Sequence, residues 1–322
     1  MEGRFGPGYA SARVGLSAFD RGVAVGLRNR SLEKYYHLML APAVLLVLLY
    51  SIVPMFGIVI AFQKFVPAKG IFGSKFVGIQ NFNLLLMYPD VRKVVLNTVV
   101  IAVSKIALGL IVPVSFAVLL NEIRWTTFRR TVQTIVYMPN FLSWVILAIM
   151  FNNIFSYTGM INSITKVFGA QPIMFLVSNA FFRPIIVGTD VWKNFGYGAV
   201  IYLAAITNID QNIYEAAAID GANRWQKITR VVLPSISSTI ILMATLSLGN
   251  VLNAGFDQVY NMYTPLVYET GDIIDTYVYR MGLEKMQYSF GTAVGLAKSV
   301  VSFVLLSVSY KLAERYAGYT LF

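Results

Sequence analysis

Six long apolar runs dominate this sequence of 322 residues. A helix needs about 20 mainly apolar residues to cross the hydrocarbon core of a bilayer. Runs of that length fall at about 38–62, 94–120, 132–151, 185–206, 236–256 and 290–313. Because a helix satisfies its own backbone hydrogen bonds in lipid, we predict an all-α integral membrane protein with six transmembrane helices.

The composition excludes most other classes of protein. Hydrophobic residues make up 57% of the chain, charged residues only 13%, and the mean hydropathy is +0.65. A soluble domain contains about 25% charged residues. The chain has no cysteine, which excludes disulfides, thiolate metal sites and cysteine nucleophiles. Its one histidine, His37, borders the first run, where we expect an interfacial residue without chemistry.

The basic residues predict the orientation in the membrane. The formal net charge is +11, and with the amino terminus inside, the inner segments hold 14 of the 26 lysines and arginines while the outer segments hold nine. This bias predicts that both termini are cytosolic, although the first outer loop carries five cations. Residues 1–37 then form a cytosolic tail rather than a cleavable signal, and 38–322 form the membrane domain. Basic residues spread over short loops argue against a nucleic-acid role.

The loop 207–235 between the fourth and fifth runs is polar and strongly patterned. Asp210 can cap a short helix because its carboxylate accepts first-turn amides, and Gly221 can end that helix in a left-handed conformation. Asn223 can cap a second helix that meets Pro234, a residue that suits the start of the next helix. The pattern predicts a helix, a glycine turn and a second helix at the cytosolic face.

A motif in this loop resembles the signature of ABC importer permeases, Glu-Ala-Ala-x3-Gly-x9-Ile-x-Leu-Pro. The chain departs from it only in having Val231 for isoleucine. The resemblance implies the type I importer permease fold and a coupling helix that sits in a cleft of a cytosolic ATPase subunit. The implied coupling residues are Glu215, Ala216, Ala217, Asp220 and Gly221. The alternative is an unrelated amphipathic helix at the membrane surface.

Segments 54–62, 76–82, 97–98 and 192–196 look like carbohydrate-uptake permeases, especially those for oligosaccharides and polysaccharides. Among these, the chain is most similar to a permease subunit of the bacterial alginate importer. The resemblance implies a bacterial inner-membrane complex with a second permease subunit, as a heterodimer, two ATPase subunits and an extracytoplasmic solute-binding protein. The sequence has no Gly-x4-Gly-Lys-Ser/Thr phosphate loop. We therefore expect no cofactor or enzymatic activity in this chain, with ATP and Mg on the partner ATPases.

Polar residues within the fourth and fifth runs suggest a path for the substrate. In the fifth run they recur at offsets of 0, 3, 7 and 8, which trace one helix face: Asn250, Asn253, Asp257 and Gln258. Polar groups at membrane depth should face protein or water. In the resembling maltose-type permeases, the two helices that flank the coupling loop hold the sugar. This similarity supports a path of Lys193, Tyr197, Asn250 and Asn253, unless these groups only bond helix to helix.

Three lysines, Lys105, Lys193 and Lys298, fall at membrane depth, where each costs about 2.5–3.5 kcal/mol on insertion scales. One hypothesis is a cationic path for an acidic polysaccharide such as alginate. The competing interpretation is that Lys105 and Lys298 snorkel or pair with Asp190 or Asp257.

Two other functions must be weighed. An ion-coupled secondary transporter of a small solute needs acidic residues in the membrane and broken helices in repeated halves, and only Asp190 and Asp257 are candidates. An intramembrane metalloprotease needs two histidines in its His-Glu-x-x-His site, and the chain has one. Both alternatives lack an explanation for the motif around Glu215.

Overall fold

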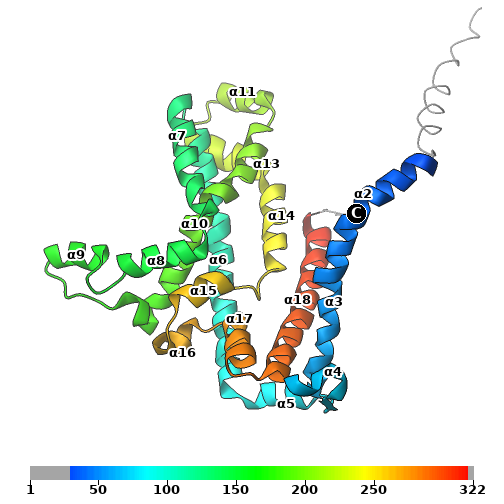
Figure 1. The fold of residues 1–322 in the computed structure, drawn as a ribbon. Coiled ribbons are helices and arrows are strands. Elements are labelled where there is room, and N and C mark those ends of the chain that lie inside the picture. The colour runs from blue at the N-terminus through cyan, green and yellow to red at the C-terminus, as the bar shows by residue number, and fades with distance from the viewer. Residues whose placement is uncertain (1–29, 318–322) are drawn as a thin grey trace, which may run out of the picture. The chain divides into compact units, whose positions relative to one another are not determined.

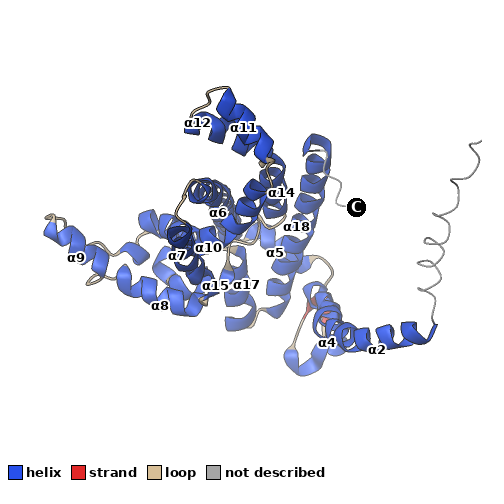
Figure 2. Cartoon of the chain, turned by 90° about the horizontal axis from the view of Figure 1, so that it is seen from above, coloured by secondary structure: helices blue, strands red, loops and turns tan. Residues whose placement is uncertain are grey.

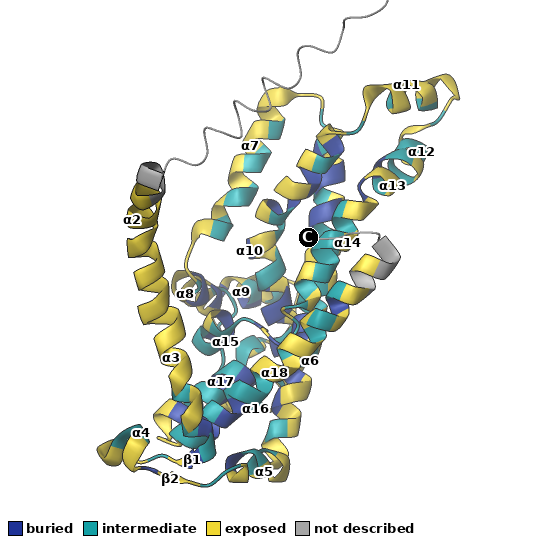
Figure 3. Cartoon of the chain, turned by 90° about the vertical axis from the view of Figure 1, so that its right-hand side faces the viewer, coloured by how far each residue is buried: buried dark blue, intermediate teal, exposed yellow. Residues whose placement is uncertain are grey.

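The computed structural model describes residues 30–317, so most of the predicted tail 1–37 lies outside the described residues. The chain divides into two compact units, 1–58 and 59–322. The first unit contains α2 (Arg30–Val47), a π-helical turn (Leu48–Ile52) and α3 (Val53–Met55). Figure 3 shows this helix exposed along its length. A helix that is apolar on all sides needs lipid or another protein around it.

The second unit begins with a small hairpin held by side-chain hydrogen bonds. A 3₁₀ helix (Phe56–Phe62) leads into β1 (Gln63–Lys64), which pairs antiparallel with β2 (Lys75–Phe76). Between the strands lie a 3₁₀ turn (Pro67–Lys69) and α4 (Gly70–Gly73), and α5 (Gln80–Met87) follows. The Asn81 amide donates to the carbonyls of Ala61 and Gln63 at 2.8 and 3.0 Å, which fixes the hairpin on α5.

The two longest helices of the first half of this unit, α6 (Pro89–Asn121) and α10 (Asn179–Thr207), pack along each other and form its centre (Figure 1). Between them come α7 (Thr126–Tyr137), a 3₁₀ turn (Met138–Phe141), α8 (Trp144–Ile154), α9 (Met160–Val167) and a second 3₁₀ turn (Phe175–Val177). Gly196 lets α10 approach α7 closely, because a Cβ there would lie 2.4 Å from the Val136 carbonyl oxygen.

The second half of the unit starts with the loop helices α11 (Gln211–Ile219) and α12 (Arg224–Lys227). A π-helical turn (Ile228–Val232) and α13 (Leu233–Ser235) lead to α14 (Ser237–Leu248). Short elements follow: α15 (Phe256–Met262), a 3₁₀ turn (Pro265–Val267), α16 (Tyr268–Gly271), α17 (Ile274–Tyr279) and a π-helical turn (Arg280–Glu284). The last helix, α18 (Tyr288–Ala317), packs against α14 and α17.

The helical architecture agrees with the predicted fold class, but two expected spans are not straight. Among the described residues, three helices are long and apolar enough to cross a membrane: Lys34–Phe62, Pro89–Asn121 and Tyr288–Lys311. Two pairs of helices are bent: Thr126–Phe141 with Trp144–Ile154 by 102°, and Arg224–Ser235 with Ser237–Leu248 by 57°. If each bent pair is one span, the number rises to five. Figure 2 shows α7 nearly end-on and α8 running across the view. The expected run 236–256 ends as a helix at Leu248.

The expected fourth span lies within α10, which is long enough but does not pass the same test of composition. Arg183, Asp190 and Lys193 are distributed along it. Polar residues at this density indicate a helix that faces protein or water rather than lipid. α10 accordingly packs against α6, α7 and the 3₁₀ turn Met138–Phe141.

Candidate functional site

The loop between α10 and α14 folds as its capping residues predict. Asp210 caps α11 by accepting from the Asn212 amide at 3.0 Å. The chain then turns at Gly221, whose φ of +73° is the left-handed conformation expected of it. Asn223 and Gln226 form a reciprocal capping box at the start of α12. The structure confirms the helix, glycine turn and helix.

Figure 3 shows that α11 is largely exposed, and most of the predicted coupling residues are exposed too. The exposed ones are Glu215, Ala216, Asp220 and Gly221, whereas Ala217 is half-buried. Two apolar side chains that the sequence analysis did not select lie beside them: Ile219 is 87% exposed and Trp225 71%. Large apolar groups in a polar loop were the signal that would have found them.

Tyr214 anchors α11 to the body of the unit. Its ring packs against the buried cluster that contains Leu120, Tyr202 and Ile236. Burial, together with the nearby Glu122 carboxylate, raises the pKa of the Tyr214 phenol above its usual value. Through Tyr214, α11 therefore contacts the packing between α6, α10 and Ile236, the residue before α14.

Asn250 and Asn253 line a cavity of about 270 Å³ between α6, α10 and the break in the fifth run. Lys105, Asp190 and Ser247 also line it. The two amides are exposed, and the cavity opens to the surface of the unit. The structure thus brings two of the four predicted path residues together with an ion pair, Lys105 Nζ to Asp190 Oδ1 at 3.3 Å.

Lys105 stabilises the break between α14 and α15. Its ammonium donates to the Ala254 carbonyl at 2.7 Å and to Gln258 Oε1, next to Gly255, where φ is +92°. Gln258 is completely buried and donates to the Ile186 carbonyl at 2.7 Å. Gln258 therefore belongs to the core, and the expected single stripe through positions 250–258 is interrupted because the helix ends at Leu248.

Lys193 stabilises the other break, the bend between α7 and α8. Its ammonium donates to the carbonyls of Pro139, Asn140 and Leu142 at 3.2, 2.7 and 2.7 Å, and the residue is 7% exposed. These contacts place the ammonium at the bend. They favour the alternative in which Lys193 bonds one helix to another and does not bind substrate. Tyr197 is 55% exposed and packs on Phe141 of the same bend. Neither residue lines the cavity of Asn250 and Asn253.

The two lysines have one physical role in common. Where a membrane helix bends, carbonyl groups lose their helical donors, and hydrocarbon offers no replacement. A lysine ammonium has three protons with which to satisfy them. The third lysine, Lys298, pairs instead with Asp275, a carboxylate that the sequence analysis did not consider; the pairing of Lys105 with Asp190 agrees with the competing interpretation given above.

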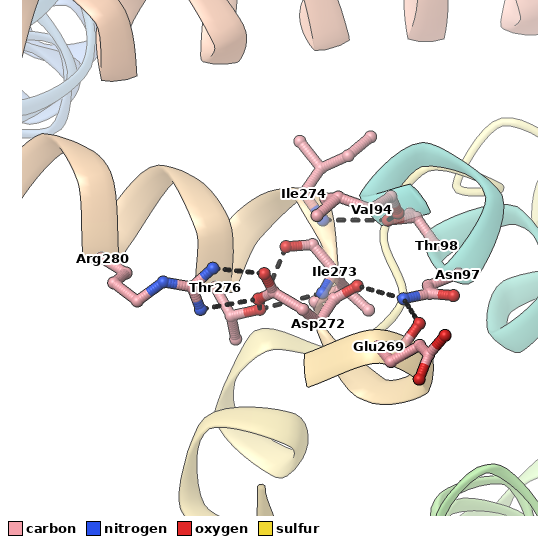
Figure 4. Close-up of polar contacts among 9 residues, drawn as sticks. All are labelled: Val94, Asn97, Thr98, Glu269, Asp272, Ile273, Ile274, Thr276 and Arg280. Atoms are coloured by element: carbon pink, nitrogen blue, oxygen red, sulfur yellow. Dashed lines mark hydrogen bonds and ion pairs between the residues drawn. The ribbon is translucent and has the colours of Figure 1, made fainter. Parts of the chain in front are cut away.

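A buried polar network fastens the segment 269–280 to α6 (Figure 4). Asn97 donates to the carbonyls of Glu269 and Asp272, both at 3.1 Å, and Thr98 Oγ1 accepts from the Ile274 amide at 2.9 Å. The Asp272 carboxylate accepts from Thr276 Oγ1 at 2.8 Å and from the Arg280 guanidinium.

Within this network, Asp272 determines the direction in which the pKa of Arg280 is shifted. Burial acts to lower the pKa of Arg280, but the hydrogen bonds and charge of Asp272 outweigh it, so the pKa is raised above its usual value. Breaking a buried pair by removing one partner leaves an uncompensated charge. The segment 269–280 is therefore a fixed part of the unit rather than a loose connection.

Comparisons with known proteins identify what the chain resembles. The family described as "Binding-protein-dependent transport system inner membrane component" matches residues 109–317. The polygalacturonan/rhamnogalacturonan transport system permease protein YteP of Bacillus subtilis (strain 168) is 39% identical over 285 residues, 88% of this chain and 89% of that protein.

Two solved structures are also similar to this chain. One is a bacterial alginate ABC transporter in complex with its alginate pentasaccharide-bound periplasmic protein, with 33% identity, a TM-score of 0.81, and coverage of 88% of this chain and 96% of the matched chain. The other is a bacterial ABC transporter involved in the import of the acidic polysaccharide alginate, with 33% identity, a TM-score of 0.82, and coverage of 89% and 97%.

Proposed function

Because the chain belongs to the family of binding-protein-dependent transport system inner membrane components, we propose that it moves an acidic oligosaccharide or polysaccharide, such as alginate, into the cytoplasm by alternating access. The chain is a multi-pass inner-membrane protein and the permease subunit of a carbohydrate type I ABC importer. It catalyses no reaction itself, since the ATPase of such importers is a separate subunit. Family membership rules out the ion-coupled secondary transporter.

The cavity lined by Lys105, Asn250 and Asn253 carries the proposal for a carbohydrate substrate. The two amides offer donors and acceptors to sugar hydroxyls, whereas the Lys105 ammonium already gives its three protons to Asp190, the Ala254 carbonyl and Gln258. The acidic nature of the substrate is proposed from the names of two similar proteins, which mention polygalacturonan and the acidic polysaccharide alginate. Within this proposal, Lys193 and Tyr197 shape the path through the bend that they contact.

We further propose the composition of the complex. A second permease subunit forms a heterodimer with this chain, two cytosolic subunits bind ATP and Mg, and an extracytoplasmic solute-binding protein delivers the sugar. The surface around Glu215, Ala216 and Gly221 binds an ATPase subunit, with Ala217 and Asp220 at its edge. The exposed Ile219 and Trp225 support this assignment because they offer apolar area to a partner.

The substrate proposal is tested on the reconstituted importer. ATPase activity is measured with the solute-binding protein and a panel of chains of equal length: galacturonan, alginate, maltodextrin and arabinan oligosaccharides. We expect the uronate chains to stimulate hydrolysis and the neutral chains to leave it near the basal rate. Equal stimulation by a neutral chain contradicts the acidic substrate, while the permease function stands.

A further inference from the structure

Five aromatic rings form a connected cluster, centred on Tyr260, to which the proposed transport function assigns no role. They are Phe256, Tyr260, Tyr263, Tyr268 and Tyr279, and we call them the aromatic ladder. Phe256 stacks on Tyr260 with 5.2 Å between ring centroids and 16° between planes. Tyr260 lies 4.9 Å from Tyr279 and 6.1 Å from Tyr263, and Tyr263 lies 5.1 Å from Tyr268.

The ladder lies partly at the surface of the unit, and Tyr263 also packs against the buried cluster that contains Ile101 and Met262. Phe256 and Tyr260 share one face of α15, Tyr263 directly follows the helix, and none of the five rings is fully buried. Asp257 is exposed and Asn261 half-buried on the adjoining face of the helix. A carboxylate and an amide on this side would be costly against hydrocarbon. The buried side of α15 is a different one, formed by Gln258, Val259 and Met262.

One end of the ladder adjoins the cavity, and a buried ion pair holds the other. Phe256 directly follows Asn253, Ala254 and Gly255, which line the cavity. At the other end, the Arg280 guanidinium lies 4.0 Å above the Tyr268 ring, and the Asp272 carboxylate of the network in Figure 4 holds that guanidinium. The rings are therefore ordered before any ligand arrives, which lowers the entropy cost of binding.

We propose that the aromatic ladder is a stacking platform for the sugar rings of the incoming chain and leads them to the cavity. Sugars present flat faces of C–H groups that pack on aromatic rings, and their hydroxyls can bond Asp257, Asn261 and the tyrosine hydroxyls. The inference rests on the carbohydrate function of the chain and not on the acidic nature of its substrate.

The test uses Tyr260, which contacts Phe256, Tyr263 and Tyr279. The complete importer carries Tyr260→Leu, Tyr260→Phe or no change, and uptake is measured against concentration for a disaccharide and a hexasaccharide of galacturonan and of maltodextrin. Aromatic pairs contribute about 0.5–1.5 kcal/mol, so Tyr260→Leu should raise the apparent KM for the hexasaccharide by up to about tenfold. The apparent KM for the disaccharide should change less. Tyr260→Phe keeps the ring, so its apparent KM for the hexasaccharide should equal that of the wild type.

The control is Tyr157→Leu, which alters a tyrosine that is 54% exposed and belongs to none of the ring pairs of the described chain. Thermal stability of each complex is measured in parallel. An unchanged KM for the hexasaccharide in Tyr260→Leu overturns the proposal, and so does an equal loss for both chain lengths. If the wild type takes up maltodextrin but not galacturonan, the acidic substrate is refuted. The apparent KM for the maltodextrin hexasaccharide in wild type and Tyr260→Leu then decides the role of the ladder.

Discussion

Replacing Lys193 by methionine tests whether this lysine supports the fold or binds substrate. Methionine keeps most of the volume of the side chain but removes all three donors to the carbonyls of Pro139, Asn140 and Leu142. An unsatisfied buried polar group costs about 1–3 kcal/mol. Three of them give a loss of about 3 kcal/mol or more in the free energy of unfolding, which corresponds to a fall of about 6 °C or more in Tm.

The assay is thermal unfolding of the purified complex in detergent, followed by its size-exclusion profile. Lys75→Met, at an exposed strand of the hairpin, is the matched control and should leave Tm unchanged. Substrate-stimulated ATPase is then measured below the transition. We expect Lys193→Met to lower Tm while the ratio of stimulated to basal activity stays near wild type. An unchanged Tm with stimulation lost only for uronate chains would refute the reasoning and make Lys193 a substrate ligand.

Three further outcomes are expected. Glu215→Lys or Gly221→Asp should abolish uptake with the affinity of the solute-binding protein unchanged, because both alter the surface proposed to bind the ATPase; normal uptake in both variants contradicts that assignment. A cysteine introduced at Gln226 should react with a membrane-impermeant thiol reagent only from the cytosol, and one at Gln171 only from outside, whereas labelling of both from one side would reverse part of the topology. Burial, with the Asp90 carboxylate, raises the pKa of Tyr277 to about 12, above the value near 10 expected in an unfolded chain, so the fold favours the neutral phenol. Its contribution should be complete below about pH 10 and lost as the pH rises toward 12, which phenolate absorbance followed together with tertiary circular dichroism would check.

The parts of the structure that local sequence controls could be predicted. The apolar runs identified the helices, and the capping residues Asp210, Gly221 and Asn223 determined the loop helices within a few positions of where they lie. Each of these signals acts over one helical turn. Neighbouring residues alone therefore suffice to predict them.

The bends and their lysines could not be predicted in this way. Hydropathy is the same for a straight helix and for one that turns by 102°, so the hydropathy of the run 132–151 did not reveal the bend, and only Pro139 within it was a local sign of a helix break. The acceptors of Lys193 lie more than 50 residues away in sequence. Gln258 shared the spacing of a polar stripe with Asn253, but the break at Gly255 turns it into the core.

The contact of Lys105 with the break between α14 and α15 has a consequence for the biosynthesis of the protein. Lys105 and the Ala254 carbonyl that it caps are separated by 149 residues, which a ribosome needs roughly 7–30 s to translate. During that interval, α6 must reside in the membrane, or wait at the translocon, with an ammonium whose final acceptor has not been made. Asp190 emerges earlier and provides a provisional partner. Nascent chains that stop after α6 and before Asp190 should therefore be the forms most dependent on insertion factors and most readily cleared by membrane proteases.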